Sequence, residues 1–221
     1  MKTLKVFAVL AVALTTVSCS RDPDVVKRKY VESGNRYFEN GKYKEAHIMY
    51  RNALRKDARY GEAYYRLGLT ELKLGNQLAA YRNFLRATET APENIDAKVQ
   101  TGRIALAGYL GNPSRNKGLA DQILQLATDI LNKDPDNTEG LRLRGYYNLV
   151  AAGKPAEALA DFRRANELKP YDPEIVLPLV ETLFGPSINK PAEAEQLARE
   201  MISRQKTYFP MYDLLYLRLA R

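Results

Sequence analysis

Two residues of this sequence have chemically reactive side chains of a type that occurs only once in it. The 221 residues contain one cysteine, Cys19, and one histidine, His47. A cysteine sulfur is a nucleophile and a metal ligand, and an imidazole transfers protons near neutral pH or binds a metal. One residue of each kind forms neither an intrachain disulfide nor a Cys/His metal cluster. Each of the two must therefore be explained separately.

The residues before Cys19 have the pattern of an export signal. Lys2 and Lys5 precede nine uninterrupted apolar residues, 6–14. As a helix this run would be about 13 Å long, whereas a membrane-spanning helix must cross about 30 Å of hydrocarbon. We therefore predict a cleaved signal peptide over residues 1–18 rather than a transmembrane helix.

The residues around Cys19 resemble the lipobox at which lipoprotein signal peptidase cuts bacterial precursors. Thr16-Val17-Ser18-Cys19 has the small residue that this family places directly before the cysteine, although Thr16 stands where leucine is usual. The resemblance implies that the Cys19 sulfur carries a diacylglycerol and that the new amino terminus is often acylated too. Two or more acyl chains anchor a protein stably to a bilayer. The alternative is an ordinary signal peptide with an incidental cysteine nearby.

On the lipoprotein interpretation, residues 19–24 are a lipidated terminus and a short tether. Ser20 follows the cysteine instead of the aspartate that resembles an inner-membrane retention signal, so we expect a periplasm-facing protein, with the outer membrane favoured. The tether would hold Lys27, Arg28 and Lys29 near anionic headgroups.

The remaining titratable residues do not predict an enzyme. His47 lies beside Ala46, which is expected to be packed, and we predict a solvent-facing role for it. Glu193 and Glu195 occupy ordinary helix-surface positions that no sequence pattern gathers into a pocket. A glycine-rich phosphate loop, HExxH and GxSxG are all missing from the sequence. We expect no catalysis, no cofactor and no metal.

Composition and charge favour a helical protein with solvated surfaces. The formal charge is +8, and removal of Lys2 and Lys5 leaves 32 basic against 26 acidic residues. Both signs are mixed along the chain without a run of five like charges, which is typical of solvated helix faces rather than of a nucleic-acid interface. An export signal likewise excludes a nucleic-acid partner. Fifteen tyrosines suit positions that are packed on one side and wet on the other.

A repeat of 34 residues must position all of these side chains. Gly34, Gly68 and Gly102 are 34 residues apart, and matching small or aromatic residues stand at fixed offsets from the first two. A later stretch repeats the pattern around Gly145. The residues that define the pattern are Tyr30, Gly34, Ala46, Tyr50 and Ala53, then Tyr64, Leu67, Gly68, Ala80, Phe84, Ala87 and Pro92, and finally Gly145, Ala158, Phe162, Ala165 and Pro170.

This pattern resembles the tetratricopeptide (TPR) repeat, in which two antiparallel helices per unit stack into a right-handed superhelix. Glycine and alanine permit close helix crossings, aromatic rings fill the spaces between helices, and proline ends the second helix. The resemblance implies an all-α solenoid over residues 25–221, with units at about 27–60, 61–94, 95–137, 138–172 and 173–208 and a partial sixth at 209–221. The fourth unit has one extra residue, which we expect in its turn near Gly153.

In the TPR family the first helix of each unit lines the concave, ligand-binding side. We therefore predict a partner-binding face there, because its mixture of apolar, tyrosine and arginine side chains suits an extended peptide or a helix. The principal predicted residues are Asn35, Phe38, Tyr65, Arg66, Leu69, Lys73, Arg103, Arg142 and Tyr146. Val31, Val99, Gln100, Leu106 and Leu149 are predicted on the same stripe.

One known mode of TPR binding is not expected here. Some TPR proteins clamp a peptide's terminal carboxylate with lysine, asparagine and arginine at set positions. Asn35 occupies a matching position, but Val31, Asp96 and Gln100 stand where basic residues are needed. We therefore expect no clamp of that kind.

The last helix is predicted to be buried on several sides. Residues 209–221 are apolar nearly all round, whereas terminal repeats usually present a polar outer face. We expect either that the chain is a fragment of a longer array or that a partner covers this end.

The sequence thus predicts a protein-binding adaptor, anchored to the bacterial envelope through Cys19, that serves an assembly, secretion or polysaccharide-export complex. Its partners would be an envelope protein or peptide and the lipid bilayer. The alternative is a carbohydrate-binding or accessory subunit of a polysaccharide-processing system, with tyrosines as stacking surfaces.

Overall fold

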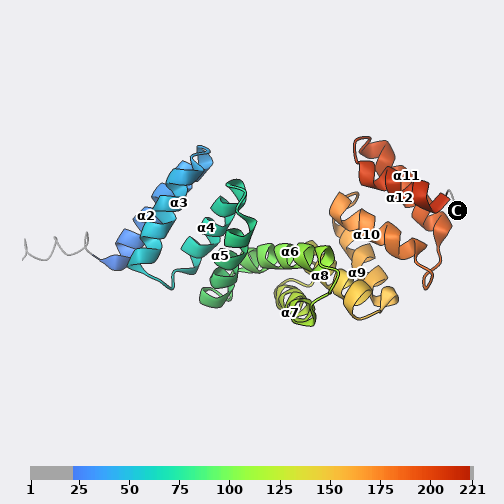
Figure 1. Cartoon of the computed structure of the whole chain (residues 1–221), viewed down its shortest axis with the longest axis horizontal. Helices are drawn as coiled ribbons and strands as arrows, with labels where there is room; N and C mark the ends of the chain where they lie inside the picture. The colour runs from blue at the N-terminus through green and yellow to red at the C-terminus, as the bar shows by residue number, and fades with distance from the viewer. Residues whose placement is uncertain (1–21, 220–221) are drawn as a thin grey trace, which may run out of the picture. The chain divides into compact units, whose positions relative to one another are not determined.

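All regular structure in the described part of the chain is helical (Figure 1). The computed structural model describes residues 22–219, so that the predicted signal peptide and Cys19 lie outside the described residues. The helices are α2 (Pro23–Glu39), α3 (Tyr43–Lys56), α4 (Gly61–Lys73), α5 (Gln77–Thr90), α6 (Ile95–Gly111), α7 (Lys117–Lys133), α8 (Thr138–Tyr146), the π-helix η2 (Tyr147–Ala151), α9 (Pro155–Leu168), α10 (Pro173–Phe184), α11 (Pro191–Arg204) and α12 (Phe209–Leu219). The helices pack in the pairs α2–α3, α4–α5, α8–α9 and α10–α11, and consecutive pairs within a unit contact each other, which confirms the all-α solenoid.

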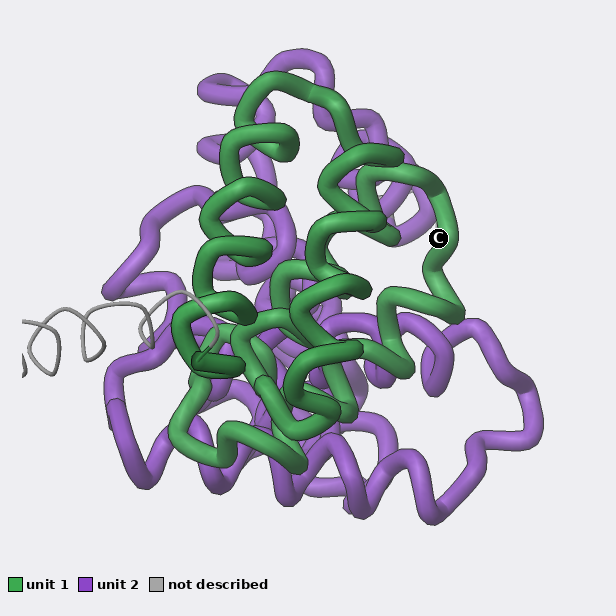
Figure 2. Tube along the Cα trace, turned by 90° about the vertical axis from the view of Figure 1, so that its left-hand side faces the viewer, with its two compact units in different colours: residues 1–97 green, residues 98–221 purple. Residues whose placement is uncertain are grey.

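The chain forms two compact units that divide inside α6, between Ala97 and Lys98 (Figure 2). The first unit contains the pairs α2–α3 and α4–α5. The second contains most of α6, then α7, the α8–α9 and α10–α11 pairs and α12. The repeat pattern in the sequence does not indicate this boundary.

Close helix crossings in three pairs depend on a glycine facing a buried aromatic ring. A Cβ atom added to Gly34 would lie 2.5 Å from a ring carbon of Tyr50, and the corresponding distances from Gly68 to Phe84 and from Gly145 to Phe162 are both 2.6 Å. All three rings are fully buried. The alanines of the pattern are also fully buried, namely Ala46, Ala53, Ala80, Ala87, Ala158 and Ala165. Backbones can approach here because one side of each crossing has no side chain.

In the α10–α11 pair, the large and the small side chain at the helix crossing have exchanged helices. Val180 follows Gly145 by 35 residues, and Ala198 follows Phe162 by 36. Both are fully buried in one apolar cluster. The larger side chain therefore comes from the first helix and the smaller one from the second, which explains why the glycine pattern fails here although the fold continues.

The extra residue of the fourth unit lies in a helix, which corrects our expectation that it lengthens the turn. Gly41, Gly75 and Gly153 end their first helices with φ of 70°, 80° and 66°, so the turn is the same in all three pairs. The Lys154 amide donates to the Asn148 carbonyl, six residues back, whereas the Asn76 amide reaches Glu71, five back. The turn needs its left-handed glycine, so the added residue widens the preceding helix into η2.

Helix α12 is buried on one face only among the described residues, contrary to the expected burial on several sides. Met211 is fully buried and Leu215 is 7% exposed, where α12 packs against α10 and α11. Phe209 and Tyr216 are 69% and 74% exposed. The buried residues are four apart and share one helix face, as apolar residues of an amphipathic helix do.

Candidate functional site

The first unit places the predicted binding residues on two first helices that contact each other, α2 and α4. We call this surface the α2–α4 face; it comprises Asn35, Phe38, Tyr65, Arg66, Leu69 and Lys73. All of these residues except Lys73, which is exposed, are half-buried. The surface therefore presents side chains that are supported from below yet accessible from above.

Asn35 is held from beneath by the second helix of its pair. The Tyr50 hydroxyl donates to Asn35 Oδ1 at 2.8 Å. Burial raises the pKa of Tyr50 to about 12, so the phenol remains a donor throughout the physiological range. Among the described residues the Asn35 Nδ2 group has no hydrogen-bond acceptor, which leaves two donors for a ligand.

The aromatic residues of the α2–α4 face are also fixed by neighbours. The Tyr65 ring lies 6.0 Å from the Phe84 ring, and burial raises the pKa of its phenol. Arg66 Nε donates to Glu62 at 3.1 Å, and its guanidinium lies 5.9 Å from the Tyr65 ring centre. Phe38 meets Tyr43 edge to face at 5.3 Å. Such fixed rings and guanidinium groups suit contacts with a peptide at low entropic cost.

The second unit joins the predicted Arg103 and Arg142 to two glutamates that were not among the predicted site residues. Arg103 Nη2 donates to Glu174 at 2.6 Å, and its other terminal nitrogen lies 3.7 Å from Glu139. Arg142 donates to Glu139 through Nε and Nη2 at 3.1 and 2.8 Å. These four residues link α6, α8 and α10 and carry no net charge.

A signal for these glutamates was present in the sequence. The second residue of each first helix from α2 to α10 is acidic, where it favours the positive end of the helix dipole. These residues are Asp24, Glu62, Asp96, Glu139 and Glu174. The repeat could have identified the row, but not its pairing with arginines of other units.

Of the principal predicted residues in the second unit, Arg103, Arg142 and Tyr146, only Tyr146 is not part of an ion pair among the described residues. Its ring packs edge to face on Phe162 at 5.4 Å. Burial raises its pKa to about 12, with the Glu181 carboxylate among the nearby charges that add to the shift. Burial also raises the pKa of Glu181, which the Arg218 guanidinium opposes. Tyr208, which was not among the predicted site residues, lies close enough to interact electrostatically with Tyr146.

Several predicted surface residues are not available to a partner. Val31 and Leu106 are 4% and 3% exposed and belong to the core, so their assignment to the binding stripe was wrong. Arg142 is 7% exposed and engaged by Glu139. Lys27 pairs with Asp24 and Asp57, both at 2.6 Å, and is not free to meet a lipid headgroup. Helical phase alone does not distinguish the side of a first helix that faces solvent from the side that packs on the next unit.

The prediction of a solvent-facing His47 was also wrong. Its side chain is 28% exposed, and its Nδ1 atom is buried 3.1 Å from a carboxylate oxygen of Glu71, without hydrogen-bond alignment. Glu71 is itself 5% exposed and accepts from Asn76 at 2.8 Å. The imidazole thus covers a buried carboxylate of the next helix pair, a structural role that requires knowledge of which helices pack together.

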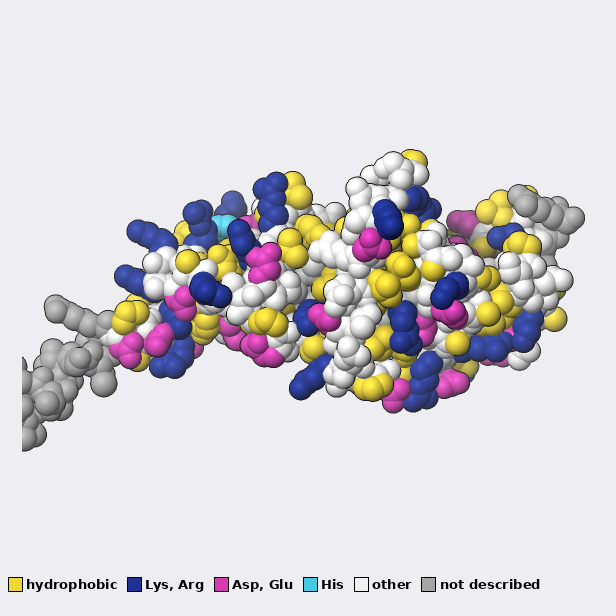
Figure 3. Space-filling view, turned by 90° about the horizontal axis from the view of Figure 1, so that it is seen from below, with side chains coloured by type: hydrophobic (Ala, Val, Ile, Leu, Met, Phe, Trp, Pro, Cys, Tyr) yellow, Lys and Arg dark blue, Asp and Glu magenta, His cyan; other side chains and the backbone are white. Residues whose placement is uncertain are grey.

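Neither a metal centre nor a membrane span is found in the part of the chain that the structure describes. Over residues 22–219 there is no group of three histidine, cysteine, aspartate or glutamate residues placed to hold a metal. No helix in that range has both the length and the apolar character needed to cross a bilayer. Figure 3 shows charged side chains of both signs on the visible face of each unit.

Comparisons with known proteins agree with this geometry. Residues 34–75 match a family model described as a TPR repeat, and residues 61–94 match one described as a tetratricopeptide repeat. YrrB, described as a TPR protein with an unusual peptide-binding site, has a TM-score of 0.68 at 18% identity, covering 91% of this chain and 97% of that one. No curated protein sequence matches this chain.

Two further crystal structures have the same fold. TTC0263, a thermophilic TPR protein of Thermus thermophilus, has a TM-score of 0.60 at 22% identity, covering 88% of this chain and 100% of that one. A tetratricopeptide repeat protein of Parabacteroides merdae has a TM-score of 0.66 at 16% identity, with 88% and 74% covered. Residues 34–94 therefore contain tetratricopeptide sequence repeats, and the chain has the fold of TPR proteins.

Proposed function

We propose that this protein is a binding scaffold that recognises a peptide or helix of a partner protein through the first helices of its repeats. TPR repeats are in general non-catalytic interaction modules, and the structurally similar YrrB is described as having a peptide-binding site. Each α-helical hairpin buries one side against its neighbours and leaves a first-helix surface accessible, which provides an extended receptor.

The arrangement around Asn35 is the observation that carries this proposal. Tyr50 fixes Asn35 from below and leaves its Nδ2 group accessible, while Phe84 supports the Tyr65 ring on the adjacent first helix. A peptide backbone is rich in carbonyl acceptors, which the Asn35 amide can bind, and the neighbouring ring adds apolar contact area. Because both side chains are already ordered, a ligand loses little of its binding free energy to their immobilisation.

A finer part of the proposal is that the scaffold is anchored in the bacterial envelope and serves an assembly, secretion or polysaccharide-export complex. Support for the anchor comes from the sequence alone, namely the apolar run 6–14 and Ser18-Cys19. Helix α2 begins at Pro23, so an acyl chain on Cys19 would hold the first repeat close to the bilayer. Metabolic labelling with an alkyne fatty acid tests this, since labelling of the wild-type chain should be lost in Cys19→Ser.

Co-purification tests the scaffold itself. The wild-type chain and the Asn35→Ala and Tyr65→Ala variants would be isolated from detergent-solubilised envelope, and the bound proteins quantified by mass spectrometry. Asn52→Ala is the matched control, because Asn52 is also half-buried but lies on the second helix α3. We expect one or a few proteins to be recovered with the wild type and the control and to be depleted about tenfold in the two variants.

The same experiment distinguishes the alternative function. Recovery of an oligosaccharide without a protein would contradict the scaffold and favour a carbohydrate-binding subunit. Equal recovery of the partner with all four chains would show that the α2–α4 face is not its binding site.

A further inference from the structure

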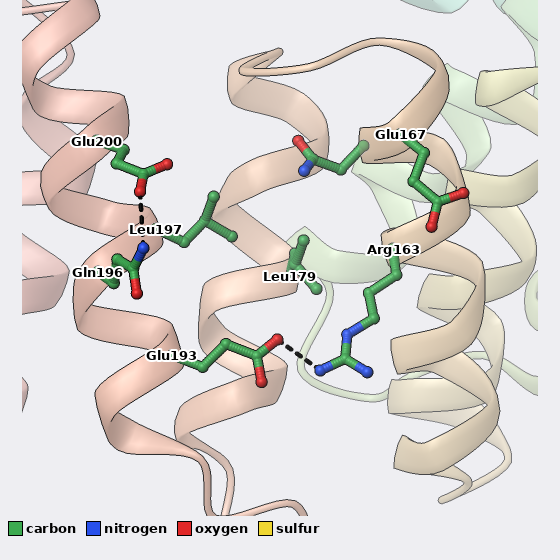
Figure 4. A pocket seen from close by; sticks show the side chains of 8 residues that line it. Arg163, Glu167, Leu179, Glu193, Gln196, Leu197 and Glu200 are labelled. Atoms are coloured by element: carbon green, nitrogen blue, oxygen red, sulfur yellow. Dashed lines mark hydrogen bonds and ion pairs between the residues drawn. The ribbon is translucent and has the colours of Figure 1, made fainter.

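A cavity lies on the second-helix side of the second unit, away from the first helices assigned to peptide binding. It occupies about 280 Å³ between α9 and α11, and α10 contributes only Leu179 to its lining. Figure 4 shows Leu179 and Leu197 in the space between the α11 carboxylates and α9. Leu179 is 2% exposed, and Leu197 packs against the same core, so the floor is apolar and firmly supported.

The polar lining of this cavity is predominantly acidic. Arg163 is its one cation, while Glu167, Glu193 and Glu200 are anions, which leaves a formal charge of −2. The expectation that glutamates such as Glu193 are not gathered in a pocket was therefore wrong for Glu193. The three glutamates of the cavity come from two helices that are about 30 residues apart in the sequence. The sequence pattern does not reveal that these helices bring them together.

Two of the three glutamates already have cationic partners. Glu193 accepts from Arg163, and Glu167 accepts from Arg164 at 3.1 Å. Glu200 differs, because its hydrogen bonds come from uncharged donors, Gln196 at 3.0 Å and the Tyr171 hydroxyl at 3.5 Å. It forms no ion pair with any residue between 22 and 219. A half-buried carboxylate that is not in an ion pair, next to an apolar floor, is a favourable receptor for a cation that also has an apolar stem.

We infer that this cavity is a second binding site, which receives an arginine or lysine side chain of a partner protein. The aliphatic stem lies on Leu179 and Leu197, and the cationic head binds Glu200 and reduces the excess negative charge of the rim. The cavity volume lies just under the range of about 300–1,000 Å³ that is typical of pockets for drug-sized ligands, so one side chain is the appropriate occupant. A hydrated inorganic ion would gain nothing from the two leucines.

This site is distinct from the α2–α4 face, and the two surfaces can be tested separately. Leucine methyl NMR spectra of the 221-residue chain would be recorded during titration with N-acetyl-arginine methylamide and, in parallel, with N-acetyl-norleucine methylamide, which has the apolar stem alone. We expect saturable shifts of the Leu179 and Leu197 methyl signals with the arginine probe. The affinity for the norleucine probe should be about tenfold lower, as for loss of a charge-assisted hydrogen bond.

Three variants identify the group that recognises the probe. Glu200→Gln keeps the shape and an acceptor oxygen but removes the charge, and should weaken arginine binding about tenfold. Gln196→Lys leaves Glu200 in place but supplies a competing ammonium group one helical turn away, and should abolish binding. Glu195→Gln is the control, because Glu195 lies on the same helix, pairs with Arg199 and does not line the cavity; its affinity should equal that of the wild type.

The inference is overturned if neither leucine shifts, if norleucine binds as well as arginine, or if Glu200→Gln binds arginine like the wild type. Shifts of these methyl groups with a neutral oligosaccharide, but not with the arginine probe, would likewise refute it. Thermal unfolding of each variant by circular dichroism confirms that a loss of binding does not reflect a loss of fold.

Discussion

Replacement of Gly68 by alanine tests whether the helix crossings hold the repeats together as the geometry indicates. In an open helix this substitution stabilises a protein by about 0.5–1 kcal/mol, because glycine is a poor helix former. At Gly68 the new Cβ would lie 2.6 Å from one carbon of the Phe84 ring and 2.7 Å from another. The ring is fully buried and cannot move aside freely.

The steric cost should therefore exceed the gain in helix propensity. Overpacking of a tight core costs about 1–3 kcal/mol, so Gly68→Ala should lower the free energy of unfolding by about 1–2 kcal/mol. Gly108→Ala is the matched control, since Gly108 lies exposed within α6 and its added Cβ would meet only Leu119, at 3.9 Å. The control should stabilise the protein by about 0.5–1 kcal/mol.

Urea unfolding followed by far-ultraviolet circular dichroism measures both effects. A third chain, Gly68→Ala with Phe84→Leu, removes part of the ring that the new methyl group meets, and should be less destabilised than the two single changes predict together. If Gly68→Ala stabilises the protein as much as Gly108→Ala does, the crossing tolerates a side chain and the packing argument is wrong.

Two further predictions concern pH. A hydrogen bond from Lys98 lowers the pKa of Asp129 in the folded protein. The Asp129 carboxylate therefore stabilises the fold fully when the pH is above its unfolded pKa, which is near 4. This stabilisation is lost as the pH falls through the lower pKa of the folded state. Asp129→Asn should therefore destabilise the protein at pH 7 but not at about pH 2 in urea unfolding, whereas Asn at the exposed Asp121 of the same helix should change little at either pH. At the alkaline end, burial raises the pKa of Tyr50 and of Tyr146 to about 12, above the unfolded value near 10. Stability should therefore fall as the pH rises from about 10 towards 12, and this fall should be smaller in Tyr50→Phe and Tyr146→Phe; an unchanged slope in both would contradict the assigned burial.

Much of the fold could be predicted from the sequence because the repeat makes the same local demands several times. A glycine or alanine at a helix crossing and the aromatic ring opposite it are separated by a fixed number of residues. The same crossing geometry is therefore predicted twice, once by Gly34 with Tyr50 and once by Gly68 with Phe84. Helical periodicity then predicts the accessible stripe on which Asn35 lies.

Pairings between helices were not predictable in the same way. The burial of His47 over Glu71, and the links from Arg103 and Arg142 to Glu174, join residues from different repeat units. The sequence pattern specifies the phase of each helix but not the small rotation that sets which side chains of neighbouring helices meet.

The sequence by itself determined that the chain is an array of helical hairpins, because this depends on the local spacing of small, apolar and aromatic residues. Only the tertiary structure decided where the extra residue of the fourth unit lies, since a turn that requires a left-handed Gly153 forces the insertion into η2. It alone also places Glu200 beside an apolar floor formed with Leu179, because that proximity arises from the packing of three helices. Packing is a property of surfaces in contact, and no single segment of the chain encodes it.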